Sequence, residues 1–169
     1  MRSLVILTML VFATGCDRKI DQVDCSDAID PQDYGKFVVD AEQGLAQHIS
    51  GTIWYRCAAG QSFQGKKCLG DSLAVTRQEA DLYAQEFSEK SGEQWRLPTK
   101  VEFEQIIEDS CDNPAVNPNI FPGLEVLNYW VANSSWHGDR FGCSIYMYKG
   151  AYYCRQGASI SQPILLVKD

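Results

Sequence analysis

The order of elements along this chain predicts one α+β domain, in which antiparallel strands are combined with two helices and a long ordered loop. Three observations support this class. Short segments rich in aromatic and β-branched residues open and close the globular part, two helix-start signals lie in its middle, and a proline-rich stretch follows the second signal. The 169 residues are 45% hydrophobic and 22% charged, which is typical of a packed domain with a short extension.

The first 15 residues are expected to be a lipoprotein signal peptide. An uncharged run, Leu4–Ala13, follows a short positive start, and its ten residues would make about 15 Å of helix, half of a bilayer core. Ala13-Thr14-Gly15-Cys16 then resembles a bacterial lipobox, in which cleavage before the cysteine leaves a thiol that receives lipid. The alternative is an ordinary secretory signal in which Cys16 is incidental.

A lipid on Cys16 would anchor the protein to a membrane of the bacterial cell envelope, facing the periplasm or the cell surface. Asp17 resembles an inner-membrane retention signal, but that rule differs between bacteria, so the choice between inner and outer membrane stays open.

The seven cysteines indicate an oxidising compartment, and their odd number is explained if Cys16 carries lipid. Six cysteines then remain for three disulfides. Cys57 and Cys68 flank a short loop that contains glycines, so they are expected to pair. Cys143 and Cys154 lie opposite each other if the turn between them is centred on residues 148 and 149, whereas moving the turn by one residue would break that register.

Residues 16–33 are polar and are expected to form a tether between the membrane and a domain at residues 34–169. By elimination, Cys25 in this tether pairs with Cys111, which would pin part of the tether to the domain.

Capping boxes mark the starts of two helices. Thr76-Arg77-Gln78-Glu79 opens the first, which is expected to stop at Gly92. Thr99-Lys100-Val101-Glu102 opens the second directly after Pro98, and this helix is expected to end near Cys111. The apolar face of the first helix consists of Ala80, Tyr83, Ala84 and Phe87.

A long loop and several strands complete the pattern. The stretch Asp112–Gly123 holds three of the chain's six prolines, which excludes a helix or a central strand and favours an ordered loop. Strands at both ends of the domain would bring its two ends side by side. Segments rich in strand-forming residues predict strands at Lys36–Asp40, Gly51–Arg56, Asn128–Asn133, Cys143–Tyr148, Ala151–Arg155 and Ile164–Lys168.

Six short sequence blocks of the chain form a recognisable combination. They are Tyr55-Arg56-Cys57-Ala58-Ala59-Gly60-Gln61, Cys68-Leu69-Gly70, Trp95-Arg96-Leu97-Pro98-Thr99, Asn113-Pro114, Phe121-Pro122 and Tyr129-Trp130. This combination resembles the C-terminal domain family named for the Legionella collagen-like adhesin (Lcl), over roughly residues 36–169. The resemblance implies a C-type-lectin-like fold, which agrees with the α+β pattern.

The acidic balance of the chain argues against several ligands. Fifteen Lys and Arg against 22 Asp and Glu give a net charge of −7, so nucleic-acid binding is not expected. The best-known member of the resembled family is an adhesin for sulfated glycosaminoglycans. Sulfate binding needs clustered basic side chains, and the domain at residues 34–169 offers only Lys66-Lys67 as a neighbouring pair, so heparin-like ligands are disfavoured.

The residue patterns favour no enzyme, no cofactor and no metal. His48 and His137 lie in no metal-ligand spacing, and nucleophile elbows and phosphate loops are missing from the sequence. An enzyme related to formylglycine-generating enzymes, which resemble this architecture, would need free cysteines or a metal. Calcium could suit the oxygen donors of the proline-rich stretch, but the signatures of calcium-dependent lectins are missing. These donors are Asp109, Asp112, Asn113, Asn117 and Asn119.

The C-terminal third holds the most suggestive surface, with nine aromatic residues among positions 121–153. Aromatic faces beside amides and carboxylates suit the recognition of sugars or peptides. In the loop after Asn133, Trp136 is expected to supply an apolar platform, although a tryptophan in a loop is often part of the core. The candidate ligand-binding residues are Asn133, Trp136, His137, Asp139 and Arg140.

These observations favour a non-enzymatic binding or adhesion module on a bacterial envelope lipoprotein, which recognises a glycan or another envelope surface ligand. The alternative is a structural or assembly partner of another envelope protein, with the aromatic surface as a protein interface.

Overall fold

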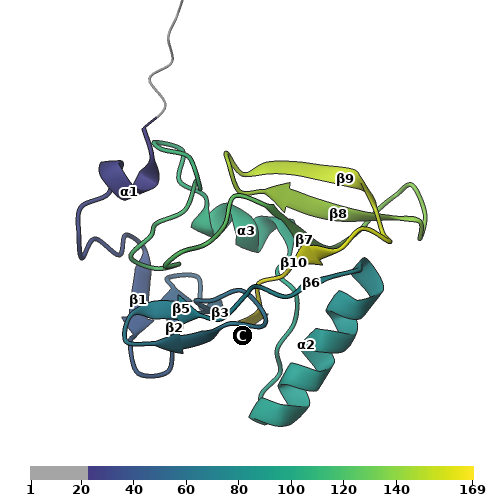
Figure 1. The fold of residues 1–169 in the computed structure, drawn as a ribbon, viewed down its shortest axis with the longest axis horizontal. Coiled ribbons are helices and arrows are strands. Elements are labelled where there is room, and N and C mark those ends of the chain that lie inside the picture. The colour runs from purple at the N-terminus through teal and green to yellow at the C-terminus, as the bar shows by residue number, and fades with distance from the viewer. Residues whose placement is uncertain (1–22) are drawn as a thin grey trace, which may run out of the picture.

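The computed structural model describes residues 23–169 and has the α+β class that the sequence predicts (Figure 1). The expected signal peptide and the lipidated Cys16 lie outside the described residues. Within the described part, no helix is long and apolar enough to cross a membrane.

Four short strands form the sheet in the lower left of Figure 1. They are β1 (Phe37–Asp40), β2 (Leu45–His48), β3 (Ile53–Tyr55) and β11 (Val167–Lys168), in the antiparallel order β1-β2-β3-β11. Trp54 of β3 lies opposite Val167 of β11, so the end of the chain pairs beside its early strands, as predicted. The sequence pattern does not predict β2, because its residues lack the aromatic and β-branched character of most strands.

A three-stranded antiparallel sheet lies in the upper part of Figure 1. Its strands are β7 (Asn128–Ser134), β8 (Phe141–Tyr146) and β9 (Ala151–Gly157), close to their predicted bounds. Two smaller pairs join β6 (Ala74–Val75) to β10 (Gln162–Pro163) and β4 (Ser62–Gln64) to β5 (Lys67–Leu69).

The strand predicted over Ile164–Lys168 is wrong in its first half. Residues 164 and 166 do not pair in a ladder, since their carbonyl groups each accept a single hydrogen bond, from the backbone N–H groups of Ala59 and Tyr55. Only the last two residues before Asp169 belong to a sheet, as β11.

The long helix α2 (Arg77–Ser91) begins and ends where its signals predict. The hydroxyl of Thr76 accepts from the backbone of Glu79, whose carboxylate accepts from the backbone of Thr76, so the capping box is complete. Gly92 ends the helix with a φ of 76°, a left-handed conformation that glycine adopts at little cost.

The second predicted helix, α3 (Lys100–Ile106), ends several residues before Cys111, so its predicted end is wrong. Ile107 has an extended backbone and forms an antiparallel bridge with Val116, and the next N–H donates to the carbonyl of Ala115. Pairing with the returning chain therefore replaces further helical turns. A short helix, α1 (Cys25–Ala28), precedes the first sheet.

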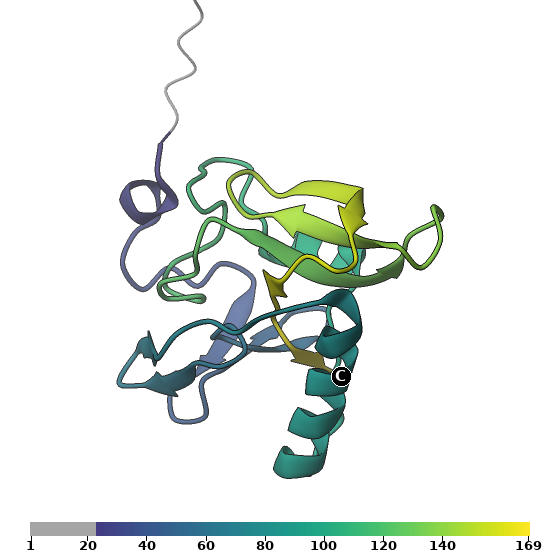
Figure 2. The same ribbon diagram turned by 45° about the vertical axis from the view of Figure 1, so that its right-hand side comes forward.

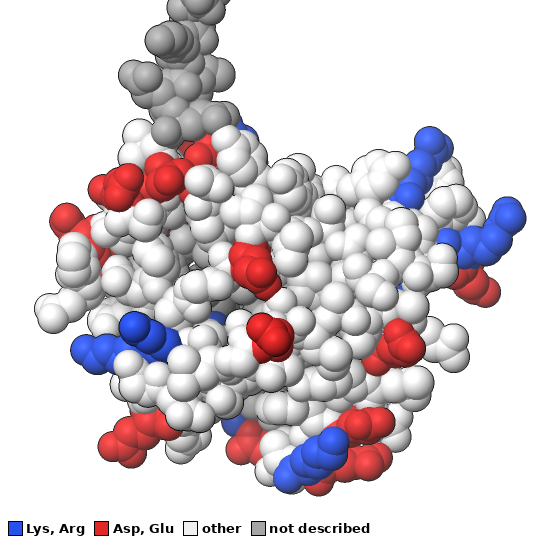
Figure 3. All heavy atoms as spheres, viewed as in Figure 1, with Lys and Arg blue, Asp and Glu red and all other residues white. Residues whose placement is uncertain are grey.

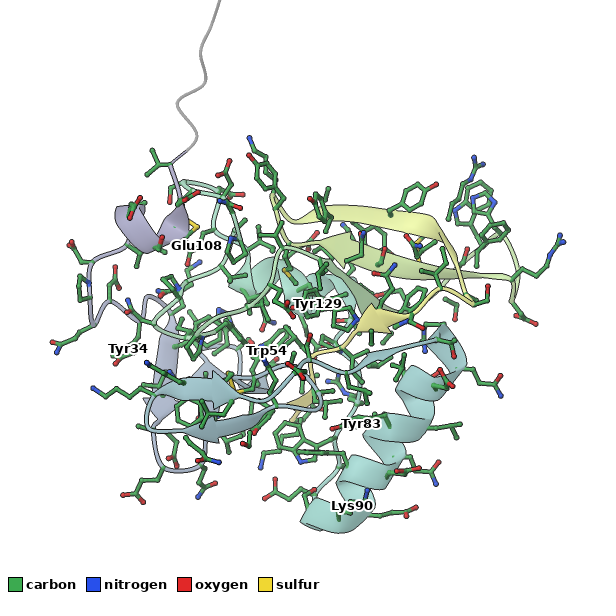
Figure 4. All side chains as sticks on the ribbon, viewed as in Figure 1. Tyr34, Trp54, Tyr83, Lys90, Glu108 and Tyr129 are labelled. Carbon is green, nitrogen blue, oxygen red and sulfur yellow. A yellow bond between two sulfur atoms is a disulfide. The ribbon has the colours of Figure 1, made fainter. Side chains whose placement is uncertain are left out.

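Two hydrophobic clusters hold these layers together. The larger lies between the two sheets and α3, and Figure 4 shows Trp54 and Tyr129 pointing into it. The smaller packs α2 against the sheets through Ala80, Trp95 and Trp130. Figure 2 shows α2 standing along one side of the molecule, with its N-terminal end next to the three-stranded sheet.

All three disulfides pair as predicted, and they join Cys25 to Cys111, Cys57 to Cys68 and Cys143 to Cys154. Tyr146 lies opposite Ala151, so the β8–β9 hairpin is centred on residues 148 and 149 as the cysteine register requires, although its connection is four residues long. Antiparallel sheets, two main helices and three disulfides are consistent with a C-type-lectin-like fold.

Candidate functional site

An open groove of about 790 Å³ separates the β7–β8 loop (residues 135–140) from the N-terminal end of α2. The walls come from segments more than 50 residues apart in sequence, so the groove exists only because α2 packs beside the three-stranded sheet. Arg77, Gln78 and Asp81 form one wall, and Ser135, Gly138, Asp139 and Arg140 form the other.

The helical wall is held in place by contacts made by Arg77. Its backbone N–H donates to the carbonyl of Ala158 at 3.0 Å, and its guanidinium donates to the carbonyl of Ala132 at 3.3 Å. The same guanidinium forms an ion pair of 2.6 Å with Asp81, one turn along the helix. Arg77 therefore fixes the end of α2 against β7.

The floor of the groove includes Gly142 of β8. A Cβ atom at this position would lie 2.7 Å from the ring of Trp130 and 3.2 Å from the aliphatic stem of Arg77. A glycine is required here because two large side chains approach the backbone closely.

Asn133, Asp139 and Arg140, three of the five predicted ligand-binding residues, line the groove. The side-chain carbonyl of Asn133 already accepts a hydrogen bond of 2.7 Å from the backbone of Lys100 at the start of α3. Asp139 and Arg140 are exposed, and their side chains form no hydrogen bond or ion pair within residues 23–169. One carboxylate and one guanidinium of the groove are therefore available to a ligand.

Trp136 and His137 do not line the groove, so the five predicted residues are divided between two places. Trp136 is 81% exposed, and its ring packs on that of His137 with 3.7 Å between centroids. The Nε2 atom of His137 accepts a hydrogen bond of 2.8 Å from Nε of Arg155 in β9. The prediction that Trp136 is a platform agrees with this exposure, and the alternative of a core residue does not.

The charges of the groove are balanced. Arg77 and Arg140 stand against Asp81 and Asp139, and Figure 3 shows charged side chains of both signs at the right-hand edge, where the β7–β8 loop projects. The carboxylate of Glu79 does not face the groove, because it closes the capping box, and the hydrogen bonds from Thr76 lower its pKa and keep it ionised. Such a site has no excess of cations for a polyanion.

The helical wall of the groove is not predictable from the sequence pattern. Arg77 and Gln78 fit a capping box, and nothing in their local pattern indicates that they face a loop from the other end of the domain. Ser134 and Ser159 are missed for the same reason, since small polar residues carry no spacing signal.

The oxygen donors that could have suited calcium serve a structural role instead. The amide of Asn117 donates to the carbonyl of Asp33 at 2.8 Å, and the amide of Asn119 donates to the carbonyl of Asp30 at 2.9 Å. Asp112 lies 3.6 Å from the ammonium group of Lys149. Among residues 23–169, no three His, Cys, Asp or Glu side chains are placed to hold a metal ion.

Comparison with known proteins agrees with these features. No curated protein matches the chain in sequence. The family model of the Lcl C-terminal domain, an extracellular adhesin-associated domain, matches residues 44–168. This range covers both main helices, the groove, the three-stranded sheet and all of the four-stranded sheet except β1. The chain therefore belongs to the Lcl C-terminal domain family.

Proposed function

We propose that this protein is a non-enzymatic recognition module of the bacterial cell envelope, and that it binds a glycan in the groove between α2 and the β7–β8 loop. The observation that carries the proposal is the pair Asp139 and Arg140, an unpaired acceptor and an unpaired donor side by side in an open groove.

Saccharide hydroxyl groups both donate and accept hydrogen bonds, so they are suited to a groove that offers both kinds of partner. The carboxylate of Asp139 accepts, while the guanidinium of Arg140 and the amide of Gln78 donate. Trp136, exposed on the same loop, offers an apolar face on which a sugar ring can stack.

The balanced charge of the groove favours a neutral or weakly charged glycan over a sulfated one. Sulfate recognition relies on several converging cations, whereas one of the two groove arginines, Arg77, is already paired with Asp81. Binding by this member of the family would then differ in ligand charge from binding to sulfated glycosaminoglycans.

A binding role is also supported by the state of the cysteines. The six cysteines of the described residues all form disulfides, which leaves no thiol there to act as a nucleophile or metal ligand. Three disulfides also indicate an extracytoplasmic protein.

Membrane attachment through lipid on Cys16 is part of the proposal. Replacing the acceptor thiol by Cys16→Ser should release the protein from membranes or leave its precursor unprocessed. Fractionation of cells that express each form provides the measurement. Normal maturation together with normal membrane fractionation of Cys16→Ser would show that the anchor is absent.

A glycan array tests the ligand. The full-length protein in detergent is compared with the double variant Asp139→Asn, Arg140→Gln, which removes both charges and keeps polar side chains at both positions. Lys66→Gln, at the turn between β4 and β5, is the matched control for loss of one exposed charge. The proposal requires that wild type and the control bind the same glycan and that the double variant does not, and it fails if wild type binds none.

Binding of a protein partner is the second candidate function, because the molecule also exposes large apolar side chains outside the polar groove. Large apolar side chains are exposed on or beside strands β6 to β10. Co-purification of one envelope protein by a wild type that binds no glycan would favour this candidate. The exposed side chains are Leu73, Leu127, Tyr146, Tyr153 and Ile160.

A further inference from the structure

Trp136, the proposed stacking platform, is held against β9 through His137, which contacts both Trp136 and Arg155. The imidazole of His137 is held between the indole of Trp136, at 3.7 Å between centroids, and the guanidinium of Arg155, at 2.8 Å from Nε2. The ring of Phe141 meets it edge-on at 6.1 Å. An exposed tryptophan is thus positioned through a histidine.

The hydrogen bond from Arg155 requires one protonation state of the His137 imidazole. An arginine guanidinium is always charged and only donates, so Nε2 of His137 must be the acceptor and cannot carry a proton. The contact therefore exists only while the imidazole is neutral. Rotating the ring does not rescue it after protonation, because both ring nitrogens are then donors.

The other groups around His137 do not compensate for an added charge. Ser135 from the same loop accepts a hydrogen bond from its backbone, Phe141 of β8 is apolar, and Arg155 of β9 is positive. Asp139 and Arg140, the nearest charged residues along the loop, line the groove. Within the described part of the chain, no carboxylate forms a hydrogen bond or ion pair with His137.

We propose that the β7–β8 loop carries a pH-sensitive switch, in which protonation of His137 breaks its contact with Arg155 and releases Trp136 from β9. The two ends of the loop stay in place, because the hydroxyl of Ser135 donates to the carbonyl of Cys154 and the backbone N–H of Ala158 donates to the carbonyl of Arg140. The neutral imidazole makes this contact with Arg155 and the imidazolium cannot, so lowering the pH releases the indole of Trp136. The inference rests on the proposed function for its ligand, which would be held at neutral pH and released in acid.

The docking step is tested without any ligand, by following the indole N–H signals of the four tryptophans by NMR between about pH 8 and pH 5. In wild type, the Trp136 signal should move with pH. In His137→Gln the signal should not move, because the side-chain oxygen of glutamine accepts from Arg155 but does not titrate. Arg155→Met, which keeps the apolar stem, should give the acid-type signal already at neutral pH.

His48→Gln is the matched control, since His48 is the only other histidine and lies in β2. This variant should keep the response of the Trp136 signal. A Trp136 signal that moves equally in wild type and His137→Gln, or moves in neither, overturns the switch.

The ligand step uses a glycan found on the array. Its affinity should fall by about tenfold in acid for wild type and stay constant for His137→Gln. Equal affinity at both pH values, with a moving Trp136 signal, overturns the coupling between loop and ligand. If no glycan binds at any pH, the proposed function fails, while the ligand-free measurement still decides the switch.

Discussion

Two polar loops of this protein have similar side chains, but one loop uses them in hydrogen bonds within the fold and the other leaves them exposed. The proline loop (residues 112–123) and the β7–β8 loop (residues 135–140) both contain asparagine or aspartate that could serve a ligand. In the proline loop, Asn117 is 3% exposed and bonds to the segment before β1. In the β7–β8 loop, Asp139 and Arg140 are exposed and unpaired within the described residues.

The difference shows that polar side chains become ligand-binding groups only when the chain itself does not use them. A buried amide must find partners or its desolvation is costly, so the asparagines of the proline loop bind the backbone of residues 30–33. The β7–β8 loop projects beyond the sheet, where water satisfies its side chains until a ligand replaces it.

The largest expected effect comes from releasing the segment that the proline loop holds. Replacing Cys25 and Cys111 together by serine should lower the free energy of unfolding by about 4 kcal/mol, because this bridge closes the longest loop. Denaturant unfolding under oxidising conditions measures it. The control, serine at Cys57 and Cys68, closes a far shorter loop and should cost about 3 kcal/mol. A smaller loss for the first pair than for the second would contradict the account.

Asn117→Ala should lower the free energy of unfolding by about 2 kcal/mol, since it removes one of the two amide hydrogen bonds to the carbonyl of Asp33 and leaves the N–H of Asn119 without its partner. Its counterpart is Asn133→Ala in β7, directly before the β7–β8 loop, where the exposed hydrogen bond from the backbone of Lys100 is lost and about 1 kcal/mol is expected. Thermal unfolding of both variants checks the order, and equal losses would mean that burial does not separate the two loops.

Glu108, beside the proline loop, should make stability depend on pH. Burial, with the nearby charges of Asp33 and Asp109, raises the pKa of Glu108 above its ordinary value (Figure 4 labels Glu108 and Tyr34). Because the folded state binds this proton more tightly than the unfolded state, stability should fall as pH rises through that pKa. Glu108→Gln should therefore be slightly more stable than wild type at neutral pH and lose this advantage in acid, as urea unfolding at several pH values would show.

The smallest effect on stability is expected for Trp136→Ala. The side chain is 81% exposed, so the free energy of unfolding should change by no more than about 0.5 kcal/mol. Glycan affinity should instead fall by about 2 kcal/mol if the indole is a stacking platform. Calorimetry with a glycan found on the array measures both, and lost stability without lost affinity would show that Trp136 acts in packing.

The two capping boxes show which features the local sequence predicts and which it does not. Thr76 with Glu79 and Thr99 with Glu102 form the same reciprocal contacts, so both helix starts are predictable. Their environments differ, however. Burial raises the pKa of Glu102, but hydrogen bonds from Arg96 and Thr99 outweigh it and bring the pKa below its ordinary value. That second role depends on Arg96, which the motif does not include.

The sequence by itself determined the features that depend on neighbouring residues. These are the helix starts, the glycine stop at Gly92, the pairing of Cys57 with Cys68 across a short loop, and the α+β order of elements. Each follows from hydrogen bonds or turns within a few residues, or from cysteine pairing that leaves few choices.

Only the tertiary structure decided where α3 ends and which polar side chains remain free. Helix α3 ends at Ile106 because the next residue, Ile107, pairs with Val116 in an antiparallel bridge. The groove forms because the guanidinium of Arg77 donates to the carbonyl of Ala132, 55 residues away along the chain. Hydrogen bonds and ion pairs between distant segments compete with local preferences, and they are decided by which surfaces the core brings together. Asp139 can therefore face a ligand while Asn117 is committed to the fold, although nothing in their local sequence separates the two.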